Sequence, residues 1–146
     1  MKGSLMLNPR GATRTNRPQR VTIATAGQGP ILVAARNQKP ERVFAEGLPL
    51  GILKTTLYEN QIRPLGRNAR VLLYTDGLAE ARNGRGEEFG LGRLQEWLQE
   101  TTCRQAKAEE LKRDLLDRLQ AFGVQAPLQD DQTFLILAEE NPEENS

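Results

Sequence analysis

Apolar residues occur along the chain in short runs and in spaced stripes, and the two patterns predict different elements. Residues 55–64 are predicted to form a further extended piece, with one face made of Leu57, Glu59, Gln61 and Arg63 and the other of Thr56, Tyr58, Asn60 and Ile62. Runs with strand character cover residues 20–25, 31–35, 42–45, 71–75 and 133–138. Helical stripes are formed by Leu91, Leu94, Trp97 and Leu98, and by Leu111, Leu115, Leu119 and Phe122. Strands followed by paired helices and a closing strand predict a mixed α and β layered domain.

Local signals set the expected boundaries of these elements. Thr102-Cys-Arg-Gln105 has the spacing of a capping box and predicts the start of the second helix, and Gly123 predicts its end. Between Asp76 and Gly90, polar residues and glycines predict a long loop. Residues 1–19 read as a disordered basic arm, 20–138 as the folded domain and 139–146 as an acidic tail without structure.

Acidic residues adjoin two of the strand-like runs. Asp76-Gly77 ends the run 71–75, and Asp130-Asp131 leads into the run 133–138. Carboxylates at strand ends are exposed and rigidly held, so two such ends that converge can bind one hard cation. The same dipeptides are also ordinary turn chemistry, and a structural domain that uses them only as turns remains an alternative at this point.

A longer string of ordered motifs connects these acids. Its parts are Ala26-Gly27-x-x-Pro30, Gly47-x-Pro49-Leu50-Gly51, Thr75-Asp76-Gly77-Leu78-x-Glu80, Gly86-Glu87-x-Phe89-Gly90 and Asp130-Asp131-x-Thr133. Together, from about residue 21 to 138, they resemble the metal-dependent serine/threonine protein phosphatases of type 2C. The resemblance is to the bacterial branch typified by stage II sporulation protein E and the sigma-factor regulators. It implies an α+β fold, the C-terminal part of a four-layer α-β-β-α sandwich with antiparallel sheets, here expected to lack its N-terminal strands.

The resemblance also implies a site. Asp76 and Asp130 correspond to metal ligands of the family and would act in catalysis through metal-activated water. Asp131 is a secondary candidate, which we expect to face away and to shape the turn. The resemblance implies two ions of Mn2+ or Mg2+ in a complete domain, and such hard cations prefer carboxylate oxygens. The implied reaction is hydrolysis of phosphoserine or phosphothreonine in a regulatory partner protein, such as an anti-sigma-factor antagonist.

Three departures from the family pattern leave a second hypothesis open. The family domain carries a Gly-Asp-x-x-x-Asp motif upstream that supplies a further metal ligand, and this sequence contains no such string. Gln28 stands where the family usually has His, and Asn68-Ala69 where it usually has Gly-Asp. The chain is therefore either the C-terminal part of a longer phosphatase or a truncated, non-catalytic binding module with the same fold.

Composition excludes several other classes of function. The 20 basic and 19 acidic side chains nearly cancel, so we expect neither nucleic acid nor membrane as a partner. The sequence contains no histidine, which excludes Ser-His-Asp triads and histidine-metal sites, and Cys103 is the single cysteine, which excludes an internal disulfide. No run is apolar enough for a signal segment or membrane span, so we expect a cytoplasmic protein. Strand edges left exposed by an incomplete sandwich predict self-association.

Overall fold

The computed structural model describes residues 5–6, 19–27, 29, 31–44, 48–123 and 131–139. Its strands are β1 (Leu5–Met6), β2 (Arg20–Ile23), β3 (Ile31–Ala34), β4 (Glu41–Val43), β5 (Gln61–Pro64), β6 (Arg70–Tyr74) and β7 (Phe134–Ala138). Its helices are α1 (Asp76–Ala79), α2 (Gly90–Thr102) and α3 (Ala108–Gly123). Of the predicted basic arm, only β1 and Gln19 are described, and the predicted tail lies outside the described residues beyond Glu139.

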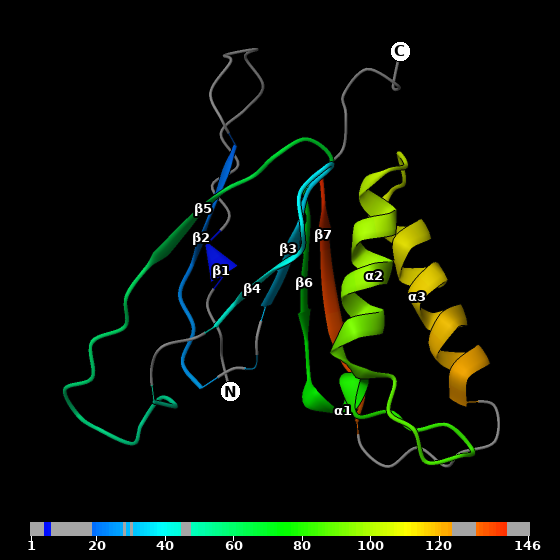
Figure 1. Cartoon of the computed structure of the whole chain (residues 1–146). Coiled ribbons are helices and arrows are strands. Elements are labelled where there is room, and N and C mark those ends of the chain that lie inside the picture. Colours follow the sequence, from blue (N-terminus) through cyan, green and yellow to red (C-terminus); the bar gives the residue numbers. More distant parts are fainter. Residues whose placement is uncertain are drawn as a thin grey trace.

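The strands form two antiparallel sheets that lie face to face. One has the order β1-β2-β5 and the other the order β4-β3-β6-β7. Helices α2 and α3 lie side by side along the outer face of the four-stranded sheet (Figure 1). The described residues therefore build a helix layer, a sheet and a second sheet, which are three of the four layers that the sequence resemblance implies.

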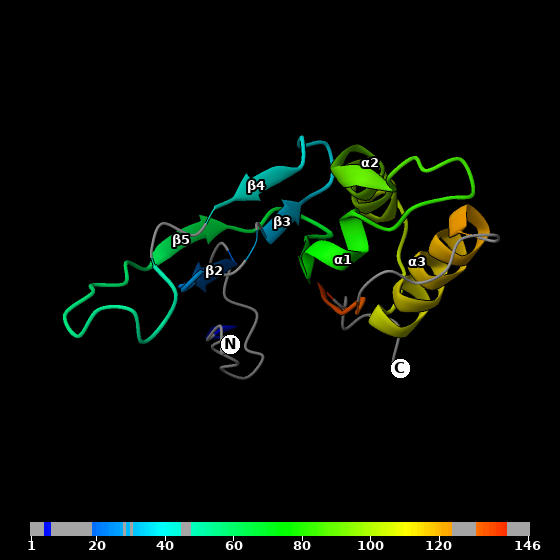
Figure 2. The same ribbon diagram turned by 90° about the horizontal axis from the view of Figure 1, so that it is seen from below.

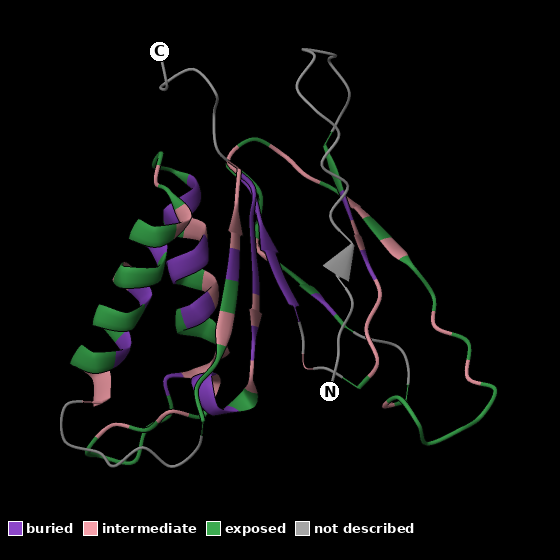
Figure 3. Ribbon diagram, turned by 180° about the vertical axis from the view of Figure 1, so that it is seen from behind, coloured by how far each residue is buried: buried purple, intermediate pink, exposed green. Residues whose placement is uncertain are grey.

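Both faces of the four-stranded sheet are buried, and each face packs into its own apolar core. Successive residues of a strand point to opposite faces, so a strand between two layers must be apolar at every position. Leu32 of β3 and Leu72 of β6 face the helices, whereas Val33 and Val71 face the other sheet. Figure 3 shows these strands as an almost continuous band of buried residues. This double burial explains why the sequence shows apolar runs here and not alternation.

Strand β6 is the central element that carries the predicted site. It pairs with β3 in the register Leu32↔Leu72 and with β7 in the register Tyr74↔Phe134. Because neighbours hold it on both sides and layers cover both of its faces, its last residue has a fixed position. The backbone immediately after Tyr74 therefore leaves the sheet at a rigid point.

Two parts of the chain differ from the sequence predictions in type of element. The predicted loop 76–90 begins with the one-turn helix α1, closed by a bond from the Glu80 N–H to the Asp76 carbonyl at 2.9 Å. Asp-Gly stops a strand, but it does not prevent a single helical turn directly afterwards. Of the predicted extended piece 55–64, only β5 pairs, with β2, because a strand forms only where a neighbour offers its backbone groups.

The predicted capping box at Thr102 is wrong. Thr102 is the last residue of α2, and its hydroxyl donates to the Gln99 carbonyl one turn back at 2.7 Å. Helix α3 begins at Ala108, where the backbone N–H of Lys107 donates to Glu110 Oε2 at 2.9 Å. A glutamate at the third helical position that accepts this N–H is half of a capping box, five residues later than predicted.

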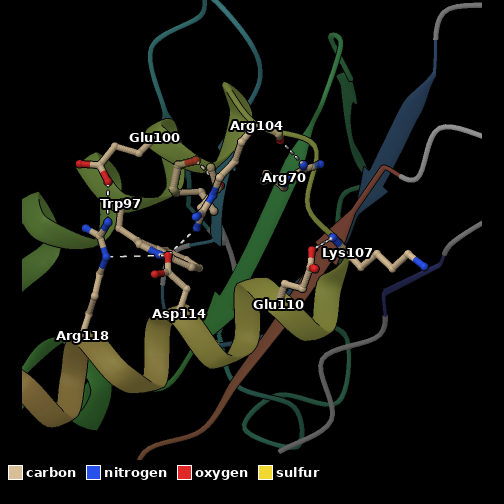
Figure 4. Close-up of polar contacts among 10 residues, drawn as sticks. Arg70, Trp97, Glu100, Arg104, Lys107, Glu110, Asp114 and Arg118 are labelled. Atoms are coloured by element: carbon tan, nitrogen blue, oxygen red, sulfur yellow. Dashed lines mark hydrogen bonds and ion pairs between the residues drawn. The ribbon is translucent and has the colours of Figure 1, made fainter. Parts of the chain in front are cut away.

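Polar contacts join α2 and the segment after it to α3 (Figure 4). Trp97 Nε1 donates to Asp114 Oδ2 at 2.8 Å, and Arg104 pairs with the same oxygen at 2.6 Å. Burial by itself raises the pKa of Asp114, but the hydrogen bonds from Trp97 and Arg104 outweigh it, so the pKa lies below its ordinary value. Arg118 pairs with Glu100 at 2.7 Å. These contacts fix the pair of helices whose inner faces cover the sheet.

Arg70 joins the beginning of β6 to two other segments. Its side chain is fully buried and donates to the carbonyls of Ala69, Arg104 and Glu139 at 3.1, 3.3 and 3.4 Å. Burial lowers the pKa of Arg70 from its ordinary value.

No helix in the described part of the chain is both long enough and apolar enough to cross a membrane.

Candidate metal and active site

Asp76 lies at the point where β6 passes into α1. Thr75 keeps an extended backbone, with φ −88° and ψ 156°, and the Leu78 N–H donates to its carbonyl at 3.0 Å. Gly77 and Leu78 are buried, and Leu78 packs into the core beneath the helices, whereas Asp76 is exposed. The buried residues therefore anchor the turn and hold the carboxylate toward solvent at the end of the sheet.

The loop between β2 and β3 lies directly against this carboxylate. A Cβ atom placed on Gly29 would lie 3.3 Å from Asp76 Oδ1. At Gly27, with φ +70°, a Cβ atom would lie 2.6 Å from Pro49 Cγ. The three sequence motifs that contain Gly27, Pro49 and Asp76 thus meet at one end of the molecule. Figure 2 views the molecule from this end, with α1 near β3.

Thr75 joins the Asp76 motif to the Asp-Asp-x-Thr motif. Its hydroxyl accepts from the Thr133 N–H at 3.1 Å and lies 3.3 Å from the carbonyl of Asp131, to which it can donate. The Thr75 N–H donates to the Thr133 carbonyl at 3.0 Å. Asp131 is exposed at this end of β7. Asp130 lies outside the described residues, so its distance from Asp76 remains a prediction.

The other acids of the motif region have partners of their own. Glu87 accepts a hydrogen bond from Asn83 Nδ2 at 2.8 Å, and Glu88 pairs with Arg82 at 2.9 Å. Both carboxylates therefore stabilise the loop between α1 and α2. Glu80 is exposed at the end of α1, one helical turn beyond Asp76. Among the residues described, no group of three or more His, Cys, Asp or Glu is placed to hold a metal ion.

Arg42 is a residue of this region that sequence reasoning missed. It pairs with Leu32 across β3 and β4, on the face that also carries Tyr74, and its guanidinium lies 4.7 Å from the centre of the Phe44 ring. Burial raises the pKa of the Tyr74 hydroxyl, with Arg42 opposing this and Asp76 adding to it. Both charges therefore act on one buried hydroxyl. Only strand pairing puts Arg42 here, because no motif in the sequence contains it.

The donor chemistry of this end fits a hard divalent cation. Asp76 offers an exposed carboxylate on a rigid turn, and carboxylate oxygens are the ligands that Mg2+ and Mn2+ prefer. The described residues contribute to such a site without completing it.

The sequence matches the model of one protein family over most of its length. The model of the family Stage II sporulation protein E (SpoIIE) matches residues 13–139. No curated protein matches the sequence at a significant level.

Several solved structures share the fold. The SiaA-PP2C domain of Pseudomonas aeruginosa is 19% identical with a TM-score of 0.63, over 85% of this chain and 48% of that one. The RsbU and RsbW domains of a Mycobacterium tuberculosis protein are 25% identical with a TM-score of 0.61, over 84% and 33%. The SpoIIE phosphatase domain of Bacillus subtilis, Mn presoaked, is 12% identical with a TM-score of 0.58, over 95% and 56%. The chain thus spans about half or less of the length of most matched structures. The shared fold confirms the expected α+β sandwich.

Proposed function

Since the chain belongs to the stage II sporulation protein E family, we propose that it serves in the metal-dependent hydrolysis of phosphoserine or phosphothreonine in a regulatory protein. One observation carries the proposal: Gly29 lies against the exposed carboxylate of Asp76, and the adjoining Thr75 bonds the Asp131 segment, so three separate family motifs meet at the end of β6. A structural domain that used these dipeptides only as turns would not require the motifs to meet at one place.

In this proposal Asp76 and Asp130 hold Mn2+ or Mg2+, and Asp131 shapes the turn. Thr75 fixes the spacing of the two acidic segments through its bonds to the backbone of Asp131 and Thr133. Such ions, when bound, supply an activated water and neutralise charge on the transferred phosphoryl group. The matched SpoIIE phosphatase domain structure is described as Mn presoaked, which supports Mn2+ as a candidate metal.

The proposed substrate is a phosphorylated regulatory protein, such as an anti-sigma-factor antagonist. The support for it is the family, together with the description of the matched Bacillus subtilis SpoIIE as a cell fate determinant. A second candidate function is a phosphatase-like module that binds such a partner without hydrolysing it. It is favoured by the lack of a third acid near Asp76 among the residues described.

Turnover of p-nitrophenyl phosphate with Mn2+ separates these two functions. Two proteins are compared: the chain alone, and the chain with a family segment bearing Gly-Asp-x-x-x-Asp fused before Val21. We expect little or no hydrolysis by the first, clear hydrolysis by the second, and its loss in the second on Asp76→Asn. A folded fusion that binds Mn2+ but shows no hydrolysis would contradict the phosphatase function and favour the non-catalytic binding module. Strong Asp76-dependent hydrolysis by the unmodified chain would show that Glu80, Glu87 or Glu88 completes the site.

A further inference from the structure

The segment that connects β4 to β5 exposes an unusual number of large apolar side chains. Leu57 is 90% exposed, and Leu50 and Leu53 are each 57% exposed. Single exposed leucines are common on soluble proteins, but several within one short segment indicate an interaction surface. We call this set the 44–57 surface, and its members are Phe44, Leu48, Leu50, Ile52, Leu53 and Leu57.

The 44–57 surface is held in place by bonds of its own segment. Tyr58 donates its hydroxyl to the Leu48 carbonyl at 3.1 Å, and Gln61 Nε2 donates to the Phe44 carbonyl at 3.1 Å. Pro49 packs against the backbone of Gly27. The two ends of the segment are therefore tied together and fixed to the loop that touches Asp76. Figures 1 and 3 show residues 48–60 at the same end of the molecule as α1.

Two basic side chains lie at this surface, and the exposed acid Glu59 follows it in the same segment. Arg42 stacks on Phe44, and Lys54 lies among the exposed leucines. In the described part of the chain, neither side chain forms an ion pair with a carboxylate. A phosphorylated side chain carries about −1.5 to −2 charges near neutral pH and pairs well with a guanidinium. An apolar surface with such a cation at its edge is complementary to a phosphorylated residue that has apolar neighbours.

We propose that the 44–57 surface docks the protein part of a phosphoprotein substrate, one whose phosphoserine or phosphothreonine is flanked by apolar side chains. Arg42 attracts the phosphate toward the Asp76 end, and the leucines bury the flanking residues. This inference rests on the proposed function, because it takes that site as the destination of the phosphate. It adds the recognition of the substrate by residues outside the metal site.

Fluorescence anisotropy with labelled peptides tests the proposal on the whole chain without added metal. The first peptide has a central phosphoserine flanked by leucine and isoleucine, the second has serine in place of these apolar residues, and the third is the first without phosphate. We expect the first to bind about tenfold more tightly than the second, since burial of one or two apolar side chains accounts for that ratio. We also expect the third to bind more weakly than the first.

Matched variants assign this preference to the surface. The double substitution Leu50→Ser and Leu53→Ser should abolish the preference for apolar flanks, and Arg42→Gln should abolish the preference for phosphate. The control is Leu116→Ser with Leu135→Ser, which removes two leucines that are 47% and 51% exposed on α3 and β7. The control should bind like the original chain. Equal peptide binding by all of these proteins would overturn the proposal.

Further measurements distinguish substrate docking from other roles of the surface. They also distinguish failure of this proposal from failure of the proposed function. Sedimentation that changes from dimer to monomer on Leu50→Ser and Leu53→Ser, with peptide binding unchanged, would assign the surface to contacts between copies and overturn the proposal. Loss of thermal stability in that variant, with peptide preference unchanged, would show that these leucines pack within the chain and would also overturn the proposal. Mn2+ binding does not involve Leu50 or Leu53, so its absence would contradict the proposed function while peptide docking is still measured.

Discussion

The hydroxyl of Thr75 accepts a hydrogen bond from the backbone N–H of Thr133 at 3.1 Å, across the ends of β6 and β7. The same hydroxyl can donate to the Asp131 carbonyl at 3.3 Å. One side chain thus joins the segment that follows β6 to the segment that precedes β7. These are the two segments that carry the acids of the proposed metal site.

Replacement of Thr75 by Val keeps the shape of the side chain and removes both bonds. We expect the free energy of unfolding to fall by about 0.5 to 1.5 kcal/mol, the usual net value of a hydrogen bond, and the affinity for Mn2+ to fall as well. Urea unfolding and calorimetry measure the two effects. Thr133→Val is the matched control, because Thr133 takes part in these bonds through its backbone alone. An equal loss in both variants would show that the hydroxyl of Thr75 has no special part.

Gly27→Ala should be among the most destabilising single-methyl additions. Its φ of +70° disfavours any side chain, and the added Cβ would lie 2.6 Å from Pro49 Cγ and 2.9 Å from the Pro49 backbone. We expect a loss of more than about 1 kcal/mol in unfolding free energy. Gly92→Ala, in α2 with nothing within 4 Å, is the control and should stabilise by about 0.5 to 1 kcal/mol. A neutral Gly27→Ala would contradict the packing of the two motif loops.

The pH dependence of stability should reflect the contacts of Asp114 with Trp97 and Arg104. The folded state lowers the pKa of Asp114 below the unfolded value of about 3.9, so this stabilisation is present above about pH 4 and lost as the pH falls through the folded pKa. Asp114→Asn should reduce stability at neutral pH by about 1 to 2 kcal/mol and flatten this acid slope. Urea unfolding at a series of pH values measures both. Asp117→Asn, which removes the same charge from an exposed position of α3, should keep the slope, and equal slopes for the two variants would refute the assignment.

The elements that were predictable from sequence are those whose signal is local. Buried runs specify β3 and β6 because both faces of these strands are covered, and leucine spacing specifies α2 and α3 because each helix buries one stripe. The predicted start of α3 is wrong because Thr102 remains in α2 and bonds back to Gln99, whereas the helix begins after Lys107, which is not a usual capping residue.

The site was predictable in its motif residues and not in its contacts. Asp76 could be selected because a strand pattern ends on it, and the family resemblance added its role. The contacts of Gly29 with Asp76 and of Thr75 with Thr133 depend on pairing between distant segments, which no local pattern encodes. Arg42 was missed for the same reason, since only the register of β3 and β4 places it on the face that carries Tyr74.

Calorimetric titration of Mn2+ into the Asp76→Asn and Asp131→Asn variants tests the central claim most directly. The two substitutions remove the same charge at the same end of the sheet, so a difference between them reports direct ligation and not long-range electrostatics. If Asp76 is a metal ligand and Asp131 shapes the turn, Asp76→Asn should lose clearly more affinity for Mn2+ than Asp131→Asn does. Equal losses, or a greater loss in Asp131→Asn, would contradict the account.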